Sequence, residues 1–303
     1  MAHKNKTAII VGTEENAELL RKKLEQDPKI EILRIFTNDA EKASDSILRN
    51  WPDAVYCALN PDDDRSADIW HACELSFCTY YAVSKVDKNS DTLVIARWCQ
   101  EPLKKGASAF FKRTFDIVVS GVFLVTFFPI IYIICAICIK ISSPGPVLFK
   151  QARPGYHAEP FYCLKFRSMR ANSRSENKAA TQNDDRVTKF GRFIRKTSID
   201  EIPQFINVFR GDMSLVGPRP QLMNQSDYYS PYISNFFMRS MVKPGITGWA
   251  QVSGFRGEMK SIEEMKGRVD KDVWYIENWT FWLDIKILFM TVAQIFKGDK
   301  QAY

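Results

Sequence analysis

The sequence predicts two α/β domains, the second of which is associated with a membrane. Three observations support this prediction. Short apolar runs alternate with helical patterns over residues 1–105, an uncharged run of 23 residues follows from Ile117 to Ile139, and basic residues gather in the remainder. At roughly 150 residues per domain, a chain of 303 residues is long enough for two. We therefore expect a Rossmann-like domain over 1–105 and a monotopic α+β domain over 106–303.

Charge divides the chain in the same place. Charged types make up 25% of the residues, as in an average soluble protein, which excludes a disordered chain, a collagen, a coiled coil and a polytopic transporter. Residues 1–105 hold 15 Lys and Arg against 18 Asp and Glu, a net of −3, whereas residues 106–303 hold 27 against 17, a net of +10. The basic excess predicts phosphate groups, nucleic acid or an anionic membrane surface as the partner of the second domain.

The first domain reads as strands that alternate with helices, which is typical of a parallel sheet. Its first turn, Gly12–Asn16, has one glycine and two carboxylates where a dinucleotide fingerprint needs three glycines. We therefore expect no dinucleotide there. Binding of a regulator, formation of a homodimer and a purely structural role stay open. The expected strands are 7–12, 29–36, 54–59 and 78–84, the expected helix is 15–26, and 85–111 is expected to be a link.

The uncharged run is long enough for a transmembrane helix, which needs about 20 residues. Pro129 lies near its middle, and proline removes a backbone donor and kinks a helix. Basic residues flank the run on both sides, although a spanning helix normally has its positive excess on one side. A re-entrant helix over about 112–140 therefore fits best; a spanning helix and a buried soluble helix are the alternatives. The flanking residues are Lys104, Lys105, Lys112 and Arg113 before the run, and Lys140, Lys150 and Arg153 after it.

The rest of the second domain alternates between regular patterns and turns. Residues 147–170 predict a hairpin, 171–185 a mobile polar loop, 196–211 a helix that ends at Gly211, and 214–220 a rigid turn. Four aromatic residues and an apolar helix follow over 274–297. Because Trp and Tyr favour the membrane–water interface, this last helix is expected to be interfacial.

The densest chemical signal is Ser198-Ile199-Asp200-Glu201. One interpretation is a capping box, in which Ser198 caps a helix and Glu201 returns to the cap amide. The other is catalytic and does not exclude the first. The positive end of the helix dipole would favour ionised carboxylates, an ionised aspartate can attack phosphorus, and a second carboxylate can hold Mg²⁺ together with substrate phosphates. Arginines near this segment in the sequence suit phosphate oxygens.

The second part of the chain, over about 108–300, resembles the bacterial sugar transferase family, the monotopic phosphoglycosyl transferases. The ordered series of motifs is specific, although Phe128 stands where many members have a serine before the proline. The matching motifs are Lys112-Arg113-x-Phe115-Asp116, the apolar run with Pro129, Ser143-Pro144-Gly145-Pro146-Val147 through Gly155, Lys165-Phe166-Arg167-Ser168-Met169, Asp185-Arg186-Val187-Thr188 through Arg195, Ser198-x-Asp200-Glu201-x-Pro203-Gln204, Gly211 through Pro220, and Lys243-Pro244-Gly245-Ile246-Thr247-Gly248-Trp249.

The resemblance implies a specific reaction. The family moves a phosphosugar from a UDP-sugar to polyprenyl (undecaprenyl) phosphate and releases UMP, the first step of lipid-linked glycan assembly for exopolysaccharide, capsule or O-antigen. Its aspartate, here Asp200, forms a covalent phosphosugar intermediate, and its glutamate, here Glu201, is linked to Mg²⁺. We therefore expect Asp200 and Glu201 to be the catalytic and metal-binding residues. It also implies a location at the cytoplasmic face of the bacterial inner membrane.

The other basic residues are expected to contact either membrane lipid or substrate phosphate. Lys112, Arg113 and Lys140 are expected against anionic lipid, where each contributes about 1 kcal/mol. Substrate phosphates are expected to be bound by Lys165, Arg167, Arg186, Arg195 and Arg219.

Two other classes of protein remain as alternatives: a catalytically inactive membrane scaffold and a basic nucleic-acid-binding regulator. The intact Asp-Glu pair argues against the first, and the lack of a recognition motif argues against the second, so no nucleic-acid partner is expected. The sugar is not fixed by the sequence; glucose and galactose are favoured over N-acetylated sugars.

Overall fold

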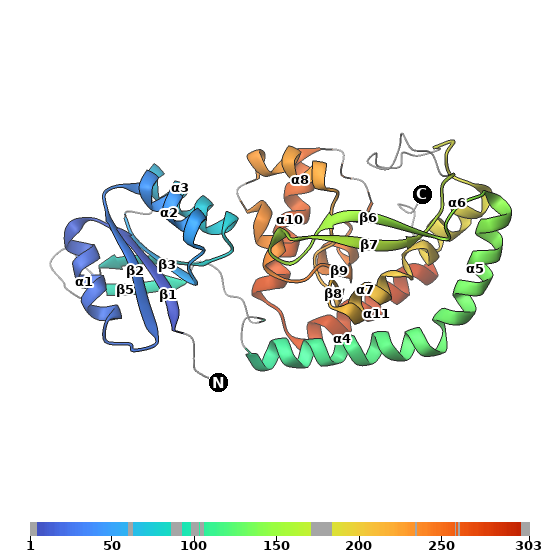
Figure 1. Cartoon of the computed structure of the whole chain (residues 1–303), viewed down its shortest axis with the longest axis horizontal. Helices are drawn as coiled ribbons and strands as arrows, with labels where there is room; N and C mark the ends of the chain where they lie inside the picture. Colours follow the sequence, from blue (N-terminus) through green and yellow to red (C-terminus); the bar gives the residue numbers. More distant parts are fainter. Residues whose placement is uncertain are drawn as a thin grey trace. The chain divides into compact units, whose positions relative to one another are not determined.

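The computed structural model describes residues 5–59, 63–85, 93–97, 103, 106–170, 184–233, 235–257, 259 and 261–297. The chain separates into two compact units, residues 1–100 and residues 101–303, and each is described here by itself (Figure 1). Except for its last two residues, the loop predicted at 171–185 lies outside the described part.

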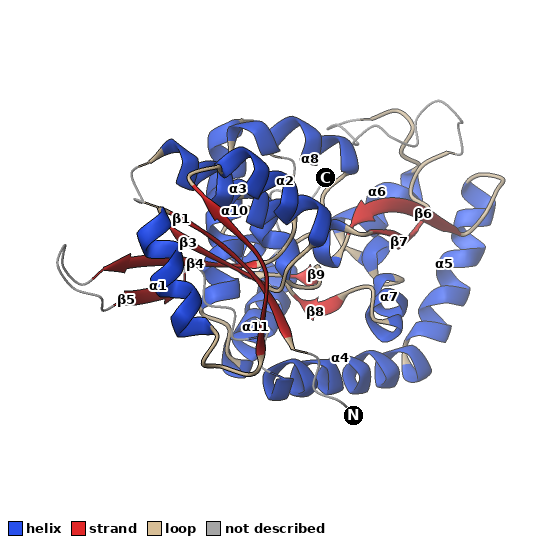
Figure 2. Ribbon diagram, turned by 60° about the vertical axis from the view of Figure 1, so that its left-hand side comes forward, coloured by secondary structure: helices blue, strands red, loops and turns tan. Residues whose placement is uncertain are grey.

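Five strands form the sheet of the first unit, in the order β2-β1-β3-β4-β5. Strands β1 to β4 run parallel, and β5 is antiparallel to β4. The parallel sheet and its four predicted strands are confirmed, whereas β5 lies in the segment predicted to be a link. The strands are β1 (Lys6–Gly12), β2 (Ile30–Thr37), β3 (Ala54–Ala58), β4 (Thr79–Lys85) and β5 (Leu93–Arg97) (Figure 2).

Helices cover both faces of this sheet. Ala8 and Ile10 of β1 pack with α1 (Glu14–Leu24), whereas Ile9 and Val11 point to the other face and pack with α2 (Ala40–Asn50) and α3 (Asp64–Leu75). This alternation follows from the two-residue period of a strand. The sequence analysis did not predict α2 or α3; α3 buries Ser66 and Glu74, which obscures its apolar stripe. The Rossmann-like character of the unit stays a prediction.

The second unit is a mixed α and β structure. Its predicted hairpin is confirmed, because β6 and β7 pair antiparallel along their whole length. In chain order its elements are α4 (Gly106–Thr126), α5 (Phe128–Ser142), β6 (Leu148–Pro154), η2 (Tyr156–Ala158), β7 (Pro160–Phe166), α6 (Lys189–Lys196), η3 (Ile199–Glu201), α7 (Gln204–Arg210), β8 (Ser214–Val216), α8 (Met223–Tyr229), η4 (Ser230–Tyr232), η5 (Phe236–Met241), β9 (Gly245–Thr247), α9 (Trp249–Val252), α10 (Ile262–Glu277) and α11 (Phe281–Lys297).

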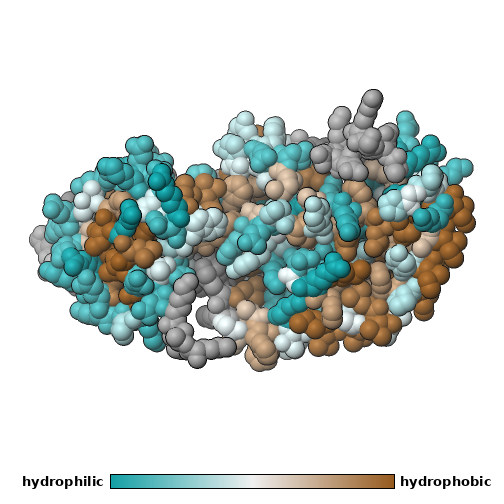
Figure 3. All heavy atoms as spheres, in the orientation of Figure 1, coloured by the Kyte–Doolittle hydropathy of each residue, from teal (hydrophilic) through white to brown (hydrophobic). Residues whose placement is uncertain are grey.

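The uncharged run forms two helices that meet at an angle of 56°. The break falls at Phe127, and Pro129 occupies the first turn of α5, where its missing N–H costs nothing. No single helix in the described part is long and apolar enough to cross a membrane, whereas α4 and α5 reach that length and composition together. Both arms expose apolar side chains (Figure 3): Val125 is 78% exposed and Ile141 is 81% exposed. The helix thus breaks two residues before Pro129, close to the predicted position, and the location of this break within a membrane stays a prediction.

Lys112 of α4 faces the protein interior, so its predicted contact with lipid is wrong, whereas Arg113 is half-buried. Lys112 is buried and forms an ion pair of 2.5 Å with Asp284 of α11. The guanidinium of Arg113 donates to the carbonyl oxygens of Val208 and Phe209, the last turn of α7. These bonds give the carbonyls at the end of α7 a charged donor, in addition to the Gly211 N–H that Val208 already accepts, and they fasten α4 to α7. Lys140, by contrast, is exposed.

The last helix presents two faces. Ile287 and Asp284 are buried, whereas Trp282 is 76% exposed and Phe289 is 73% exposed. The exposed aromatic side chains suit the predicted interfacial position, which stays a prediction.

Candidate active site

The segment predicted to be catalytic forms a single 3-10 turn, η3, rather than the start of a helix. Ser198 precedes the turn with a positive φ of 57°, a conformation that is strained for a residue with a side chain. Its hydroxyl accepts a hydrogen bond of 2.8 Å from Arg256 and caps no helix. The predicted capping box is therefore wrong, because Arg256 occupies Ser198 and the Glu201 side chain bonds elsewhere. The α-helix starts only at Gln204, although it ends at Gly211 as predicted.

Glu201 is held by two cations from distant elements. Lys165 of β7 donates to Oε1 at 2.6 Å, and Arg219 donates to Oε1 at 2.5 Å and to Oε2 at 3.0 Å. Burial alone would raise the pKa of Glu201, but the charges and hydrogen bonds of Arg219 and Lys165 outweigh it and hold the pKa well below its usual range. The structure thus brings together three of the predicted site residues.

Asp200 has no such partner. Its side chain is 7% exposed, and within the described part of the chain no donor lies within hydrogen-bond distance of its carboxylate. Burial raises its pKa to about 6 and the charge of Glu201 adds to this, against the opposite effects of Lys165, Arg195 and Arg219. The prediction that a helix dipole favours the ionised form is wrong in direction, because the loss of water outweighs every favourable charge nearby. A buried carboxylate that accepts no hydrogen bond from the described residues and lies near three cations is suited to attack an electrophile that carries negative charge.

The position of Lys165 depends on a buried amide. Asn207 of α7 accepts a hydrogen bond of 2.9 Å from the Leu164 N–H and donates at 2.9 Å to the Tyr162 carbonyl. Both partners lie in β7, so one side chain fixes the strand that carries Lys165 against the helix that follows Glu201.

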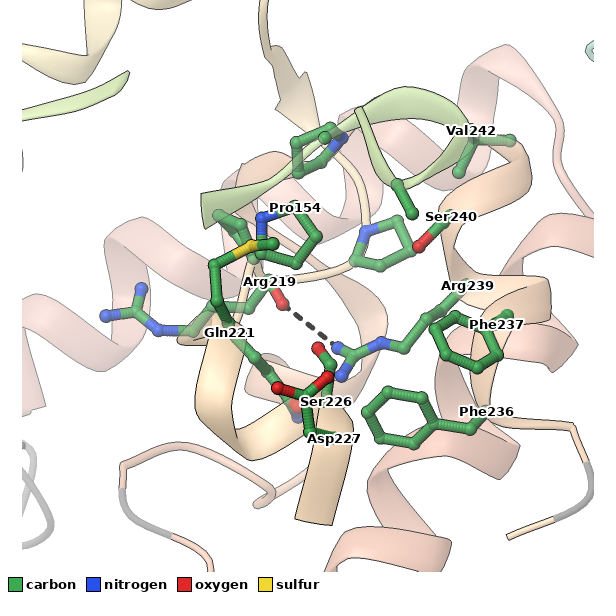
Figure 4. A pocket seen from close by; sticks show the side chains of 16 residues that line it. Pro154, Arg219, Gln221, Ser226, Asp227, Phe236, Phe237, Arg239, Ser240 and Val242 are labelled. Atoms are coloured by element: carbon green, nitrogen blue, oxygen red, sulfur yellow. Dashed lines mark hydrogen bonds between the residues drawn. The ribbon is translucent and has the colours of Figure 1, made fainter. Parts of the chain in front are cut away.

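The turn that carries Arg219 is packed backbone to backbone. A Cβ atom on Gly217 would lie 2.5 Å from the Lys243 carbonyl oxygen, and one on Gly245 would lie 2.1 Å from the Gly217 nitrogen. Only glycine permits such an approach. Figure 4 shows the Arg219 side chain leaving this turn on the side away from a cavity of about 110 Å³, toward which its carbonyl group points.

The remaining predicted phosphate-binding residues separate into two groups. Arg195 donates to the Ser168 hydroxyl at 3.0 Å and is close enough to Asp200 to lower its pKa. Arg186 forms a two-point ion pair with Asp184, and Arg167 donates to the carbonyls of Ser143 and Pro144. The guanidinium group of Arg167, which was predicted to bind phosphate, therefore holds the turn after α5 instead. The cations that bind Glu201 are Lys165 and Arg219, and the described contacts of Arg167 and Arg186 lie elsewhere.

Two arginines at this site escaped the sequence analysis. Arg153, which was counted as a flank of the membrane run, lies in β6 and donates to the Pro220 carbonyl. Arg256 reaches Ser198 from the loop after α9. Arg153 stands inside one of the family motifs, so the signal for it was present, whereas nothing in the local sequence connects Arg256 with Ser198.

A divalent cation would find only a partial protein site here. No cluster of three or more His, Cys, Asp or Glu side chains occurs in the described residues. Glu201 Oε2 accepts a single hydrogen bond and Asp200 accepts none from the described residues, so both carboxylates keep a free lone pair. Mg²⁺ is commonly held by one or two carboxylates together with substrate phosphates. The donor set therefore fits Mg²⁺ that arrives with a phosphate ligand.

Known proteins are similar to this chain mainly over its second unit. The family model described as bacterial sugar transferase matches residues 107–298. A UDP-glucose:undecaprenyl-phosphate glucose-1-phosphate transferase of Escherichia coli (strain K12) is 48% identical over 201 residues, which are 65% of this chain and 42% of that protein. The chain spans about two fifths of the length of the first curated relatives that it matches.

Other relatives extend further along the chain. A protein of the same name from Caulobacter vibrioides is 40% identical over 251 residues, which are 81% of this chain and 92% of that protein. A UDP-N-acetylgalactosamine-undecaprenyl-phosphate N-acetylgalactosaminephosphotransferase of Aeromonas hydrophila is 36% identical over 256 residues, or 81% of this chain and 59% of that protein. The names of these relatives agree in the lipid acceptor and differ in the sugar.

Proposed function

The chain belongs to the bacterial sugar transferase family, and from that premise we propose that it transfers a sugar phosphate from a UDP-sugar to polyprenyl phosphate and releases UMP. The observation that carries the proposal is the contrast between two neighbouring carboxylates. Glu201 is neutralised by Lys165 and Arg219, whereas Asp200 is buried beside the same cations with no donor of its own among the described residues.

Asp200 is the proposed nucleophile. One of its oxygens forms a bond to the β-phosphorus of the UDP-sugar as the bond between this phosphorus and the oxygen bridging to the α-phosphate breaks, and the electron pair leaves with UMP. An oxygen of polyprenyl phosphate then attacks the same phosphorus and frees Asp200. With a pKa of about 6, the carboxylate is mostly ionised at pH 7 and is more basic than an ordinary aspartate.

The surrounding cations are proposed to stabilise charge on the phosphate oxygens. Arg195 and Arg219 lie close enough to Asp200 to lower its pKa, so they also lie near a phosphorus bonded to it. Preorganised donors of this kind lower the barrier because they need no reorientation during the reaction. Mg²⁺, bound through Glu201 and the substrate, would neutralise part of the diphosphate charge. With Mn²⁺ in place of Mg²⁺, addition of the UDP-sugar should change the electron paramagnetic resonance spectrum of the ion in the wild type. Loss of this change in Glu201→Gln would support the metal site.

We propose that the bent pair α4–α5 enters the membrane and returns to the cytoplasmic face of the bacterial inner membrane. Exposed apolar side chains on both arms and the kink beside Pro129 support this proposal. Tags placed before residue 107 and after residue 142 should then react with reagents from the same side of the membrane. Reaction from opposite sides would show a spanning helix.

The direct test of the function is release of UMP by the detergent-solubilised protein supplied with Mg²⁺, polyprenyl phosphate and a panel of UDP-sugars. We expect the highest rate with UDP-glucose, the donor named in the relatives from Escherichia coli and Caulobacter. A faster rate with a UDP-N-acetylhexosamine would change the assigned sugar but keep the reaction. No release with any donor would leave an inactive membrane scaffold as the better interpretation.

A further inference from the structure

Two loops bring arginine side chains to the catalytic turn. The turn Gly217–Pro220 supplies Arg219, which binds Glu201, and the loop after α9 supplies Arg256, which binds Ser198. The residues held in this way stand directly on either side of Ile199 and Asp200. The placement of Asp200 therefore depends on how firmly these two loops are fixed.

A second, buried arginine donates hydrogen bonds to the backbone of each loop. Arg239 of η5 is 7% exposed and donates to the Arg219 carbonyl oxygen at 3.0 Å, the bond drawn as a dashed line in Figure 4. Arg268 of α10 is 5% exposed and donates to the Phe255 carbonyl at 2.8 and 3.0 Å and to the Gly257 carbonyl at 2.8 Å. Phe255 and Gly257 are the neighbours of Arg256 in the chain, so its loop is held on both sides.

Asp272 forms an ion pair with the first of these arginines and interacts with the second through its charge. It is 1% exposed, accepts a hydrogen bond of 2.5 Å from Arg239, and lies four residues after Arg268 on the same face of α10. Burial and the charge of Arg239 lower the pKa of Arg268, and the charge of Asp272 counteracts them. Removal of this carboxylate would leave two buried guanidinium groups without compensation.

We infer that Asp272 is a positioning residue of the active site, which acts through Arg239 on the turn of Arg219 and through Arg268 on the loop of Arg256. One carboxylate on α10, a helix capped by Ser261, would thus act on both sides of the catalytic turn, through its hydrogen bond to Arg239 and its charge on Arg268. The inference rests on the proposed function, because it assigns a role in that reaction to a residue that touches neither Asp200 nor Glu201 in any described contact.

The first experiment measures hydrogen exchange in the full chain and does not need activity. Asp272→Asn should raise the exchange of the Gly217 and Phe255 amides, which are hydrogen bonded at 2.8 and 3.0 Å in the structure, by about tenfold or more. Glu74→Gln, which removes a carboxyl group of similar burial from the first unit, should leave both amides unchanged. Unchanged exchange at both amides in a folded Asp272→Asn protein would overturn the inference.

The conservative variants keep the test valid if Asp272→Asn does not fold. Arg239→Lys and Arg268→Lys retain the charge but lose the planar fork. Arg239→Lys should loosen mainly the amide of Gly217, and Arg268→Lys mainly that of Phe255. The inference fails if both variants loosen the two loops equally or not at all.

The second experiment is a double-mutant cycle on UMP release. Asp272→Asn should lower kcat about tenfold in the wild type with little change in KM. In the Arg219→Ala, Arg256→Ala background it should lower kcat by less than about threefold, because residues that act through one another are not additive. An equal effect in both backgrounds would show a purely structural role and contradict the inference. An inactive wild type would count against the proposed function alone, since the exchange result stands without it.

Discussion

The two units of this chain treat charge in opposite ways. Among the described residues of the first unit, Glu74 is the one charged side chain in the buried class, and the other charges lie at or near the surface. The second unit buries Lys112, Asp116, Arg167, Asp200, Arg239, Arg268, Asp272 and Asp284. Burial of a charge is costly unless it is paired and hydrogen bonded, and the second unit pairs Lys112 with Asp284 and Arg239 with Asp272. These eight buried charges are four basic and four acidic, so they cancel, and the net charge of +10 over residues 106–303 comes from the residues outside this set.

The sharpest test of this contrast exchanges one carboxyl group in each unit. Asp200→Asn should lower UMP release by a factor of about 10³ or more and abolish the proposed covalent phosphosugar adduct, because it removes the proposed nucleophile. Mass spectrometry of the protein after incubation with the UDP-sugar detects the adduct. Glu74→Gln should retain wild-type turnover at equal folded concentration. Adduct formation by the Asn variant would refute the role of Asp200.

A second test compares two-point arginine pairs. Arg219→Lys loses one of the bonds to Glu201 and should lower kcat by about 10- to 100-fold, within the range for removal of a donor near the reacting phosphate. Arg65 forms a similar pair with Asp63 but is 45% exposed. Arg65→Lys should leave both turnover and Tm unchanged, because an exposed ion pair contributes little to stability. Steady-state kinetics and thermal unfolding of both variants provide the measurement. Equal kcat for Arg219→Lys and the wild type would contradict a role of Arg219 in the reaction.

The third test uses pH. Because the pKa of Asp200 is about 6, transfer should fall by about tenfold per pH unit well below that value. The raised pKa also means that the native state binds this proton more tightly than the unfolded chain does. The contribution of Asp200 to stability is then fully present below pH 4 and is lost as the pH rises through 6.

Comparison with the neutral variant isolates that contribution. The Tm of the wild type minus that of Asp200→Asn should fall as the pH increases from 4 to 7. A constant difference in Tm over this range would show that the carboxyl group has an ordinary pKa in the folded protein.

The smallest expected effect concerns apolar side chains on the surface. Val125→Asn on α4 should reduce partition into membranes by a few fold, because a polar group replaces a side chain that is 78% exposed in the apolar arm. Leu33→Asn changes a residue that is 38% exposed in the first unit and should leave partition unchanged. Flotation of each variant with lipid vesicles provides the measurement, and equal partition of Val125→Asn and wild type would argue against insertion of α4.

Local patterns predicted much of this structure. Short apolar runs located β1 to β4, and Pro129 indicated the break between α4 and α5, because each signal depends on neighbours in the sequence. The hairpin of β6 and β7 was predicted for the same reason. Asp200 and Glu201 were found together because the family motif places them side by side.

Partners that come from distant segments escaped prediction. Lys112 was assigned to lipid, since nothing near it in the chain shows that Asp284 lies 2.5 Å away. The capping box failed because Glu201 finds stronger, charged partners in Lys165 and Arg219. The dipole argument failed at Asp200 because burial is a tertiary property. Local motifs thus indicated which charged residues matter, whereas the distant residues that pair with them became visible only in the fold.

The interlocked backbones at Gly217 and Gly245 have a consequence for genetics. A methyl group at either position would overlap main-chain atoms that hold the turn of Arg219, so a random screen for inactive alleles should return these two codons often. Such alleles would yield poorly accumulated protein, although neither residue carries a reactive group. Protein abundance therefore has to be measured for each allele before a loss of glycan is assigned to chemistry.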